Sequence, residues 1–343
     1  MRAVIQDQYG SPDLLRIDEV DRPVPGPGQV LVRVHGASVH ADVWHMVRGV
    51  PLALRVMGAG VRRPTVRIPG TDMAGVVEGV GPATERFQVG DRVFGEVIEG
   101  GLQWRNGATF AEYVAVDEGF LEPVPTGVDL LAAAALPTSG LIALFTVRQE
   151  VQVQAGERVL VNGAAGGVGQ MCAQIARADG AHVTGVERTD RLDLLEEVGV
   201  DEVIDGTRTD YTTGTAGPGR YEVVIDIPGN RPYSAARRVL ADGGRYALVG
   251  HDRYGAGGHR WLGSIPRVAG LMARSLVDRS LPRPDFSGPA PGSMHDLAEL
   301  VASQAVRPVI GATYPLAQAP AAVAHLESGR ARGKVVLQVA GSS

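Results

Sequence analysis

A glycine-rich stretch in the middle of the chain has the residue types that bind the phosphates of a nucleotide. The sequence VLVNGAAGGVG (residues 159–169) is an apolar run that ends in small residues, and the helical pattern of QMCAQIARADG follows it. In the order Ala164-x-Gly166-x-x-Gly169, Gly166 lets the backbone approach a pyrophosphate and Gly169 lets the helix pack closely on the strand. Ala164 stands where this pattern usually has glycine, and Gly163 before it absorbs the turn. The stretch predicts a dinucleotide-binding turn at a helix N-terminus.

The residues at the end of the next apolar run bear on which coenzyme binds. Glu187 comes where an acidic side chain holds the ribose hydroxyls of NAD. Arg188, Thr189 and Arg191 follow, and guanidinium groups bind a 2′-phosphate well. The carboxylate favours NAD and the arginines favour NADP, unless Arg191 belongs to a solvated helix face. We expect NADPH, with Glu187 turned aside or paired with an arginine, and with NADH as the other coenzyme to consider.

A second group of polar residues, in ASVHADVWHMVRG (residues 37–49), contains the candidates for acid–base chemistry. His40 is a residue that donates a hydrogen bond to a substrate oxygen or protonates an enolate near neutral pH, and Asp42 would orient it. His45 is the third candidate. The alternative is that both histidines make structural or coenzyme contacts. A metal site of His40, Asp42 and His45 also stays open, because two imidazoles and a carboxylate are acceptable ligands, but their spacing does not demand one.

The elements that position these residues change in type along the chain. Up to about residue 125, short apolar or alternating runs separated by Pro and Gly predict a β-rich region. A helical stretch over 129–150, broken at Pro137, follows it. From Arg158 on, strands alternate with helices, and one of these helices is expected over PYSAARRVLADGG (residues 232–244). This alternation predicts a parallel sheet covered on both faces, and we expect the tail to return to the first domain.

Composition limits the class of protein. A chain of 343 residues is long enough for two domains, or for one domain interrupted by another. No apolar run approaches the ~20 residues that span a bilayer, and the N-terminus turns polar too early for a secretory segment, so we expect a cytoplasmic protein. The scattered arginines and the net charge of −5 are not typical of nucleic-acid binding. Cys172 is the only cysteine, which excludes an intramolecular disulfide and a zinc site of several thiolates.

Together these segments resemble the medium-chain dehydrogenase/reductase superfamily, and in particular its zinc-independent, quinone-oxidoreductase-like branch. The resemblance extends over nearly the whole chain and rests on GASVHADVW, RIPGTDMAGVVEGVG, FQVGDRVFG, FAEYVAV, AAALPTSGLIAL, GERVLVNGAAGGVG, VIDIPGN and ARGKVVLQV. It implies an α/β fold in which a GroES-like, partly open β-barrel domain (residues 1–125 and 289–343) is interrupted by a Rossmann doubly wound parallel-sheet domain (residues 126–288). The active cleft would lie between the domains, and the resemblance also implies a homodimer.

The same resemblance implies a set of coenzyme-binding residues. They lie in the glycine-rich turn, at the ends of strands and in the tail: Thr138, Gly163, Ala165, Gly166, Gly167, Val168, Glu187, Arg188, Arg191, Ile227, Pro228, Gly250, His251 and Lys334. Lys334 is the only lysine of the chain, and we expect it near the nicotinamide or between the domains. The alternative is a solvent-exposed residue at the start of a strand. Gly206 departs from the family pattern, because relatives often have a tyrosine there that lies near the adenine.

The resemblance also bears on zinc and on the reaction. Zinc alcohol dehydrogenases of this superfamily have ligands near the positions of His40, Thr71 and Ala135, and because a catalytic zinc normally needs three protein ligands we expect no metal. Without a Lewis acid, hydrogen-bond donors alone must stabilise the developing charge, which favours reduction of a quinone or of the C=C bond of an α,β-unsaturated carbonyl compound. We expect an NADPH-dependent, zinc-independent oxidoreductase of this kind. The alternatives are a zinc-free alcohol dehydrogenase or carbonyl reductase that acts on a biosynthetic intermediate, and a non-catalytic NADP(H)-binding sensor or structural protein.

Overall fold

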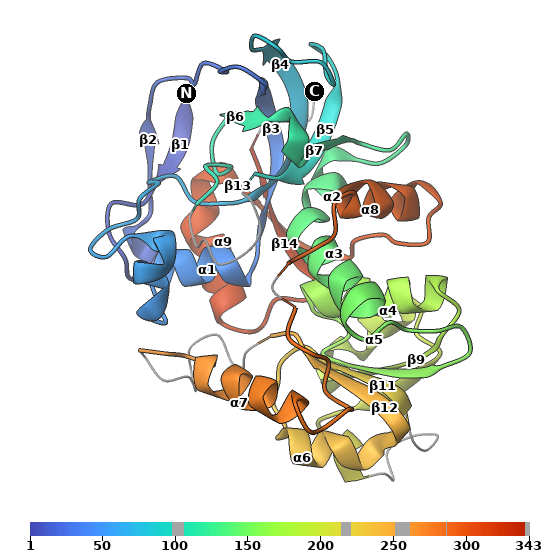
Figure 1. The fold of residues 1–343 in the computed structure, drawn as a ribbon. Coiled ribbons are helices and arrows are strands. Elements are labelled where there is room, and N and C mark those ends of the chain that lie inside the picture. The colour runs from blue at the N-terminus through green and yellow to red at the C-terminus, as the bar shows by residue number, and fades with distance from the viewer. Residues whose placement is uncertain (98–105, 214–220, 251–260, 286, 340–343) are drawn as a thin grey trace. The chain divides into compact units, whose positions relative to one another are not determined.

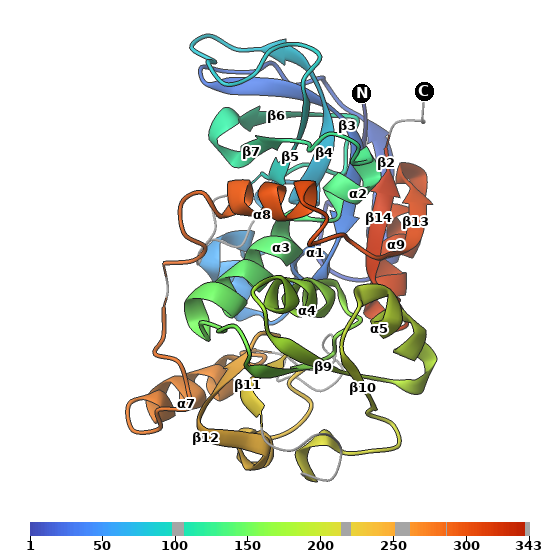
Figure 2. The same cartoon turned by 90° about the vertical axis from the view of Figure 1, so that its right-hand side faces the viewer.

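The computed structural model, drawn in Figures 1 and 2, describes residues 1–97, 106–213, 221–250, 261–285 and 287–339. The chain forms two compact units. The first unit contains Met1–Thr138, Met294–Ala302 and Ile310–Ser343, and the second contains Ser139–Ser293 and Ser303–Val309. The domain limits expected from the sequence, at 125/126 and 288/289, stay a prediction.

The first unit is built around one long strand that has three neighbours. This strand is β3 (Gln29–Val39), and it pairs antiparallel with β4 (Asp72–Val80), β6 (Tyr113–Asp117) and β14 (Lys334–Gln338). The sheet continues from β4 to β5 (Arg92–Glu96) and β7 (Leu121–Pro123), and from β14 to the parallel strand β13 (Ile310–Pro315). A separate hairpin joins β1 (Arg2–Ile5) to β2 (Arg16–Glu19). Because β14 comes from the end of the chain, the tail completes the first unit, which confirms the prediction (Figure 1).

The helices of the first unit cover this sheet or follow its strands. They are α1 (Ala41–Arg48), α2 (Leu130–Ala134), α8 (Ser293–Ala302) and α9 (Ala319–Glu327), with single 3₁₀ turns at Pro12–Leu14, Glu118–Phe120 and Leu316–Gln318 and a π-type turn at Arg55–Ala59. Helix α2 packs on β3, β4 and β5, and α9 packs on β13 and β14. Helix α1 ends at Gly49, whose φ of 62° is the left-handed conformation that glycine adopts at helix ends.

The second unit contains the parallel sheet that the alternating pattern predicts. Its strands are β8 (Arg158–Asn162), β9 (His182–Glu187), β10 (Glu202–Asp205), β11 (Tyr221–Asp226) and β12 (Leu240–Leu248). Their spatial order, β10-β9-β8-β11-β12, is the order of a Rossmann half with its neighbouring strands, which confirms the expected fold class. Helices α4 (Gly167–Ala178) and α5 (Leu192–Val198) pack on β8, β9 and β10 (Figure 2).

The remaining helical segments complete the described part of the chain. Helix α3 (Pro137–Leu144) continues into a π-type turn at Phe145–Glu150, and 3₁₀ turns occur at Thr189–Arg191, Tyr211–Thr213 and Arg237–Val239. Helix α6 (Tyr233–Ala236) precedes β12, and α7 (Ile265–Ser275) follows it along the chain. The break at Pro137 lies where the sequence predicts it, between α2 and α3.

The expected helix over residues 232–244 is wrong in its second half. Helix α6 ends at Ala236, and β12 begins at Leu240. Leu240 and the tyrosine of strand β11, Tyr221, belong to one buried apolar cluster. Burial against the sheet therefore overrides the helical pattern, and Gly243, with a φ of 77°, lies within the irregular start of the strand rather than at a helix end.

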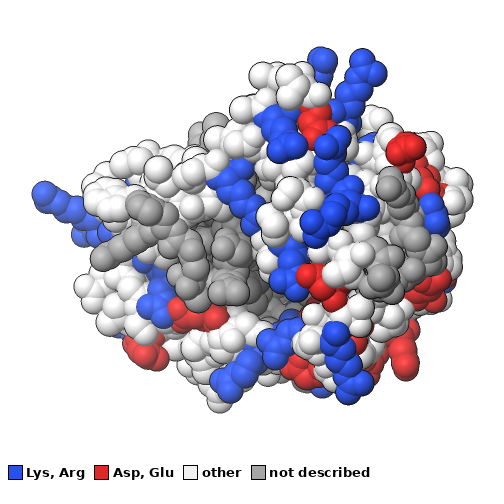
Figure 3. Space-filling view, turned by 90° about the horizontal axis from the view of Figure 1, so that it is seen from below, with Lys and Arg blue, Asp and Glu red and all other residues white. Residues whose placement is uncertain are grey.

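Two surface properties bear on the kind of partner. Within the ranges that the structure describes, no helix combines the length and the apolar character that crossing a membrane requires. On the face that Figure 3 shows, basic side chains are spread among acidic and uncharged ones. The scattered arginines in the sequence predict such a distribution.

Candidate active site

The glycine-rich turn joins β8 to α4, as the sequence predicts. Gly163 has a φ of 81°, which glycine adopts without strain. Helix α4 begins after Gly166, and no side chain of the described residues caps its first turn. A Cβ at Gly169 would lie 2.0 Å from the carbonyl oxygen of Gly163, so this close packing of α4 on the end of β8 needs glycine. The N–H groups of the first helical turn have no acceptor inside the helix, and groups of this kind are suited to bind an anion.

The carboxylate of Glu187, at the end of β9, lies beside this turn. Its Oε2 accepts a hydrogen bond of 3.4 Å from the backbone N–H of Ala165, and its Oε1 accepts one of 3.0 Å from the N–H of Arg188. Glu187 is only 8% exposed, whereas Arg188 is exposed and its Nε donates to Asp190 at 3.1 Å. The glutamate therefore faces the turn, and the Arg188 side chain extends towards Asp190.

Other predicted coenzyme residues meet the turn at the carboxyl edge of the sheet. Ile227 and Pro228 follow β11, and Gly250 follows β12. A Cβ on Gly163 would lie 2.9 Å from Cδ of Pro228, and one on Gly250 would lie 2.2 Å from the carbonyl oxygen of Ile227. The three segments are thus in close contact, at the edge where α/β sheets bind nucleotides. His251 lies outside the described residues.

These residues fit a pyridine dinucleotide. The turn has a glycine where a Cβ would collide with backbone, the helix N-terminus is uncapped, and an acidic side chain lies at the end of the second strand. The helix N-terminus matches the pyrophosphate and the acidic side chain matches the ribose, while the glycine lets the helix pack closely on the strand. That these residues bind the coenzyme stays a prediction.

A second group of polar side chains is buried in the first unit, around Asp72. Asp72 is 0% exposed and accepts hydrogen bonds from Ser38 Oγ (2.6 Å), Thr138 Oγ1 (2.5 Å) and Thr138 N (3.2 Å). Lys334 Nζ donates to Ser38 Oγ at 3.3 Å. Lys334 is 2% exposed, so the alternative of a solvent-exposed lysine is wrong. Burial lowers the pKa of Lys334, and the nearby carboxylates oppose that shift.

His40 lies at the edge of this network. Its Nε2 is 2.8 Å from Thr71 Oγ1 and 3.9 Å from Asp72 Oδ1, and its Nδ1 is 3.8 Å from Asp42 Oδ2. In the part of the chain that the structure describes, this buried Nδ1 has no hydrogen-bond partner. Burial lowers the pKa of His40 more than Asp72 and Asp42 raise it, which favours a neutral ring. A neutral ring with one unused nitrogen is able to hydrogen-bond a ligand.

His45 has contacts of a different kind. Its Nδ1 donates to the carbonyl oxygen of Val50 at 2.7 Å, and its ring lies edge-on to Trp44 with the ring centroids 4.8 Å apart. The structure thus brings Asp42 close to His40 and ties His45 to the turn after α1. Among the described residues, no three His, Cys, Asp or Glu side chains form a group able to hold a metal ion.

Glu96 is a polar residue of this cluster that the sequence analysis missed. It lies at the end of β5, opposite Asp72 in β4, and its Oε1 is 3.1 Å from Thr138 Oγ1. Burial, Asp72 and Asp42 raise the pKa of Glu96 to about 8. The sequence contains one indication of this pair. In RVFGE and in GTD, a single acidic residue stands next to residues whose pattern predicts a buried strand.

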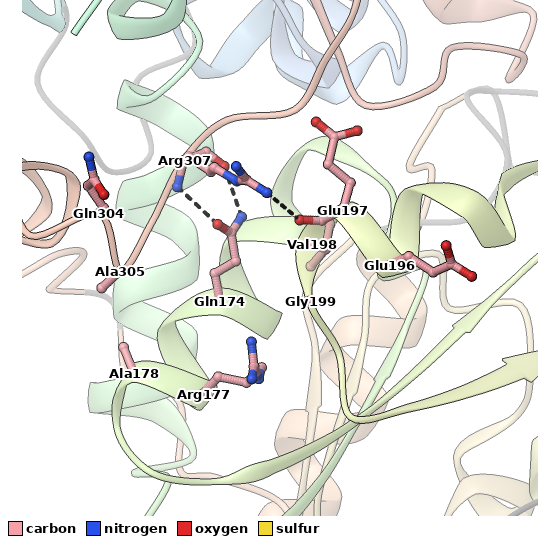
Figure 4. Close-up of a pocket in the computed structure, with 10 residues that line it drawn as sticks. All are labelled: Gln174, Arg177, Ala178, Glu196, Glu197, Val198, Gly199, Gln304, Ala305 and Arg307. Carbon is pink, nitrogen blue, oxygen red and sulfur yellow. Dashed lines mark hydrogen bonds between the residues drawn. The ribbon is translucent and has the colours of Figure 1, made fainter. Parts of the chain in front are cut away.

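A hollow of about 440 Å³ in the second unit lies away from the glycine-rich turn (Figure 4). Its lining includes Gln174, Arg177, Ala178, Glu196, Glu197, Val198, Gly199, Gln304, Ala305 and Arg307. It lies at the carboxyl ends of α4 and α5. There the backbone N–H of Arg307 donates to Gln174 Oε1 at 2.9 Å, and Gln174 Nε2 donates back to the Arg307 carbonyl oxygen at 2.9 Å. These bonds fasten segment 303–309 to α4.

The chain is similar over its whole length to known proteins. Residues 26–126 match the model of the alcohol dehydrogenase GroES-like domain, and residues 198–337 match that of the zinc-binding dehydrogenases. Quinone oxidoreductase of Rattus norvegicus is 31% identical over 353 aligned residues, which cover 98% of this chain and 97% of the relative. Among solved structures, an NAD-dependent alcohol dehydrogenase has a TM-score of 0.81 at 27% identity and covers 99% of this chain and 100% of its own. The quinone oxidoreductase from Coxiella burnetii also has a TM-score of 0.81, at 24% identity and 99% coverage of both chains.

Proposed function

Because the chain belongs to the quinone-oxidoreductase-like branch of the medium-chain dehydrogenase/reductase superfamily and is an NAD(P)H-dependent oxidoreductase, we propose that it reduces a quinone or the C=C bond of an α,β-unsaturated carbonyl compound. NADPH is the preferred donor in this proposal, and no zinc takes part. One contact carries it: His40 and Thr71, at two positions that the resemblance assigns to zinc ligands in zinc enzymes, hydrogen-bond each other at 2.8 Å. The two side chains thus form part of a hydrogen-bonding site.

The second unit holds the coenzyme, which supplies a hydride when bound. The N–H groups at the start of α4 bind the pyrophosphate, and Glu187 accepts from a ribose hydroxyl. The segments 227–228 and Gly250 line the nicotinamide half. We propose His251, Thr138 and Lys334 as further contacts to that half.

His40 stabilises the oxygen on which charge develops. In the tautomer in which Thr71 donates to Nε2, the hydrogen is on Nδ1, and the carboxylate of Asp42 at 3.8 Å favours that tautomer. The unused Nδ1–H then donates to the substrate oxygen. A positioned donor of this kind is effective because it needs no reorganisation as the charge forms. His45 stays a candidate for this site, with its Nδ1–H occupied by Val50.

The preference for NADPH rests on the charges after β9. The Glu187 carboxylate already accepts two backbone N–H groups, while the exposed Arg188 and its neighbour Arg191 are the cations of the segment. The guanidinium groups would bind the 2′-phosphate. Because Glu187 can also accept from a free 2′-hydroxyl, NADH would serve as a weaker donor.

The proposal is tested with NADPH and a panel of quinones and enones, followed by product analysis. Loss of a C=C bond or formation of a quinol supports it, and no NADPH oxidation with any compound of the panel contradicts it. Elemental analysis that finds stoichiometric zinc in active protein contradicts its zinc-free part.

A second candidate function is reduction of a C=O bond without zinc. The structural likeness to an NAD-dependent alcohol dehydrogenase at 27% identity favours it. The same product analysis separates the two, because this reaction yields an alcohol and keeps the C=C bond. A homodimer and a cytoplasmic location are part of the proposal, and size-exclusion chromatography with light scattering tests the first of them.

A further inference from the structure

Two carboxyl side chains face each other across neighbouring strands of the first unit. Asp72 in β4 and Glu96 in β5 are directly opposite in the antiparallel register. The Cβ atoms of such a pair are about 5 Å apart, and two like charges there destabilise the sheet. Asp72 is fully buried and Glu96 is partly exposed. Two carboxyl groups this close in a poorly solvated place do not both ionise near neutral pH.

The hydrogen-bond donors and acceptors around Thr138 indicate which of the two carboxyl groups is protonated. Thr138 Oγ1 is 2.5 Å from Asp72 Oδ1 and 3.1 Å from Glu96 Oε1, so one hydroxyl lies within hydrogen-bond distance of two carboxyl oxygens. A hydroxyl has one hydrogen to donate. Asp72 also accepts from Ser38 and from the Thr138 backbone, so it is the acceptor in each of its hydrogen bonds to described residues. With the Thr138 hydrogen donated to Asp72, the contact between Thr138 Oγ1 and Glu96 is a hydrogen bond when Glu96 carries a proton and donates it.

The other charged groups that face the pair agree with this assignment. Asp42 adds negative potential at Glu96, Lys334 opposes it, and burial favours the neutral acid, so that the pKa of Glu96 rises to about 8. His40 is close to Asp72, and its burial favours the neutral ring, so it does not supply a compensating positive charge.

We propose that Asp72 and Glu96 hold one proton between them across the Thr138 hydroxyl, and that Glu96 delivers this proton to the reduced substrate. The second part rests on the proposed function. In enone reduction the C=C π bond breaks: the β-carbon gains a hydride with its electron pair, which the bound coenzyme would supply, and the α-carbon gains the proton of Glu96. Glu96 is left as a carboxylate and regains its proton from water through its partly exposed side chain, while Asp72 stays ionised.

Among the residues of this cluster, Glu96 is suited to the role. Reduction of a C=C bond consumes one proton for each hydride, and a general acid works best when its pKa is near the working pH. Asp72 has no exposure to solvent, whereas the side chain of Glu96 is partly exposed to water. His40 keeps its role as the hydrogen-bond donor to the substrate oxygen.

Infrared spectroscopy tests, without any substrate, whether Glu96 carries a proton. The difference spectrum of the full-length protein below and above about pH 8 should contain a carboxylic-acid C=O band that disappears at the higher pH. Burial also raises the pKa of Glu150 to about 7, so this group contributes a band of its own, and the Glu96 band is the part of the difference spectrum that is absent in Glu96→Gln. Glu78→Gln is the matched control, because Glu78 belongs to the same strand as Asp72 but pairs with Arg22 and Arg33. The control should keep the band.

The pH profile of kcat tests whether Glu96 delivers its proton to the substrate. With an enone that the native protein reduces, kcat should fall about tenfold per pH unit above the pKa of Glu96, and Glu78→Gln should show the same fall. Glu96→Gln should lose at least about 100-fold in kcat and show no such fall.

Each outcome separates the two parts. A difference spectrum that is the same in the native protein and in Glu96→Gln overturns the proton held by Glu96. A band that depends on Glu96 together with an unchanged pH profile in Glu96→Gln overturns the delivery. The protein could also show a band that depends on Glu96 and yet reduce no compound of the panel. That result establishes the proton held by Glu96 but contradicts the proposed function, and with it the transfer of this proton to a substrate.

Discussion

Replacing Gly169 by alanine should weaken coenzyme binding and also lower the stability of the protein. The added Cβ would lie 2.0 Å from the Gly163 carbonyl oxygen, 2.8 Å from the Gly163 carbonyl carbon and 3.0 Å from Ala164 Cα. All three atoms are backbone, so no side chain can rotate away. Either the first turn of α4 retreats from β8, or the turn before it changes conformation.

The contact distance sets the size of the displacement. A carbon and an oxygen in close contact are about 3.3 Å apart, so a contact of 2.0 Å requires the turn and the helix to separate on the order of 1 Å. Overpacking of this kind costs about 1–3 kcal/mol of stability. For a unit of this size that lowers the melting temperature by about 2–4 °C per kcal/mol. The displaced N–H groups should weaken NADPH binding at least about tenfold, since about 1.4 kcal/mol of lost interaction suffices for that.

Calorimetric titration with NADPH and thermal melting measure the two effects. Gly270→Ala is the matched control, because no atom lies within 4 Å of a Cβ there and the residue is in the exposed part of α7. Alanine in a helix interior should stabilise this variant by about 0.5–1 kcal/mol and leave NADPH affinity unchanged. Native affinity in Gly169→Ala would refute the assignment of the turn as the pyrophosphate site.

Four further changes have defined outcomes. Because the pKa of Glu96 is raised from 4.5 to about 8 by folding, the native protein should lose stability relative to Glu96→Gln as the pH rises from 4.5 to 8, and no further loss should follow above 8; urea unfolding over this range measures it. His40→Ala should lower kcat by about 10²–10³, the usual effect of losing one donor to a developing oxyanion, while the NADPH dissociation constant stays near its native value. Arg188→Ala should weaken NADPH binding by about 10–100-fold and NADH binding much less, as expected for a charged hydrogen bond to the 2′-phosphate. Glu187→Gln should shift the ratio of the two affinities towards NADPH by on the order of tenfold, because it removes a negative charge near that phosphate; an unchanged ratio would place the ribose elsewhere.

The parts of the fold that the sequence predicts are those that local patterns determine. Strand β8 has a continuous apolar run, VLV, β9 (HVTGVE) ends in a charged residue, and the glycine-rich turn is constrained by its own backbone. The segment 232–244 was predicted less well, because Val239 and Leu240 fit a helix as well as a strand. Only their burial against the sheet decides, and that contact joins residues distant in sequence.

The cluster around Asp72 shows why the site was only partly predictable. Its residues come from β3, β4, β5, β14 and the start of α3, and no spacing along the chain relates them. Thr138 and Lys334 entered through a family resemblance, as coenzyme contacts, whereas the structure shows them in one network with Asp72. Glu96 was missed because its importance depends on the β4–β5 register, which places it opposite another acid.

The charges of this buried network support a protonated Glu96, and this argument does not depend on the hydrogen bonds of Thr138. Lys334 and Asp72 are each no more than 2% exposed and are joined through Ser38, so a protonated lysine and an ionised aspartate balance each other. A buried charge without a partner costs several kcal/mol, and a second carboxylate at Glu96 would have no cation left to balance it. The neutral imidazole of His40 supplies none. With Glu96 protonated, no further negative charge is added to that of Asp42 and Asp72. Lys334→Met should therefore change the pH at which the infrared band disappears, moving it upwards, because the removed positive charge is the one that lowers the pKa of Glu96.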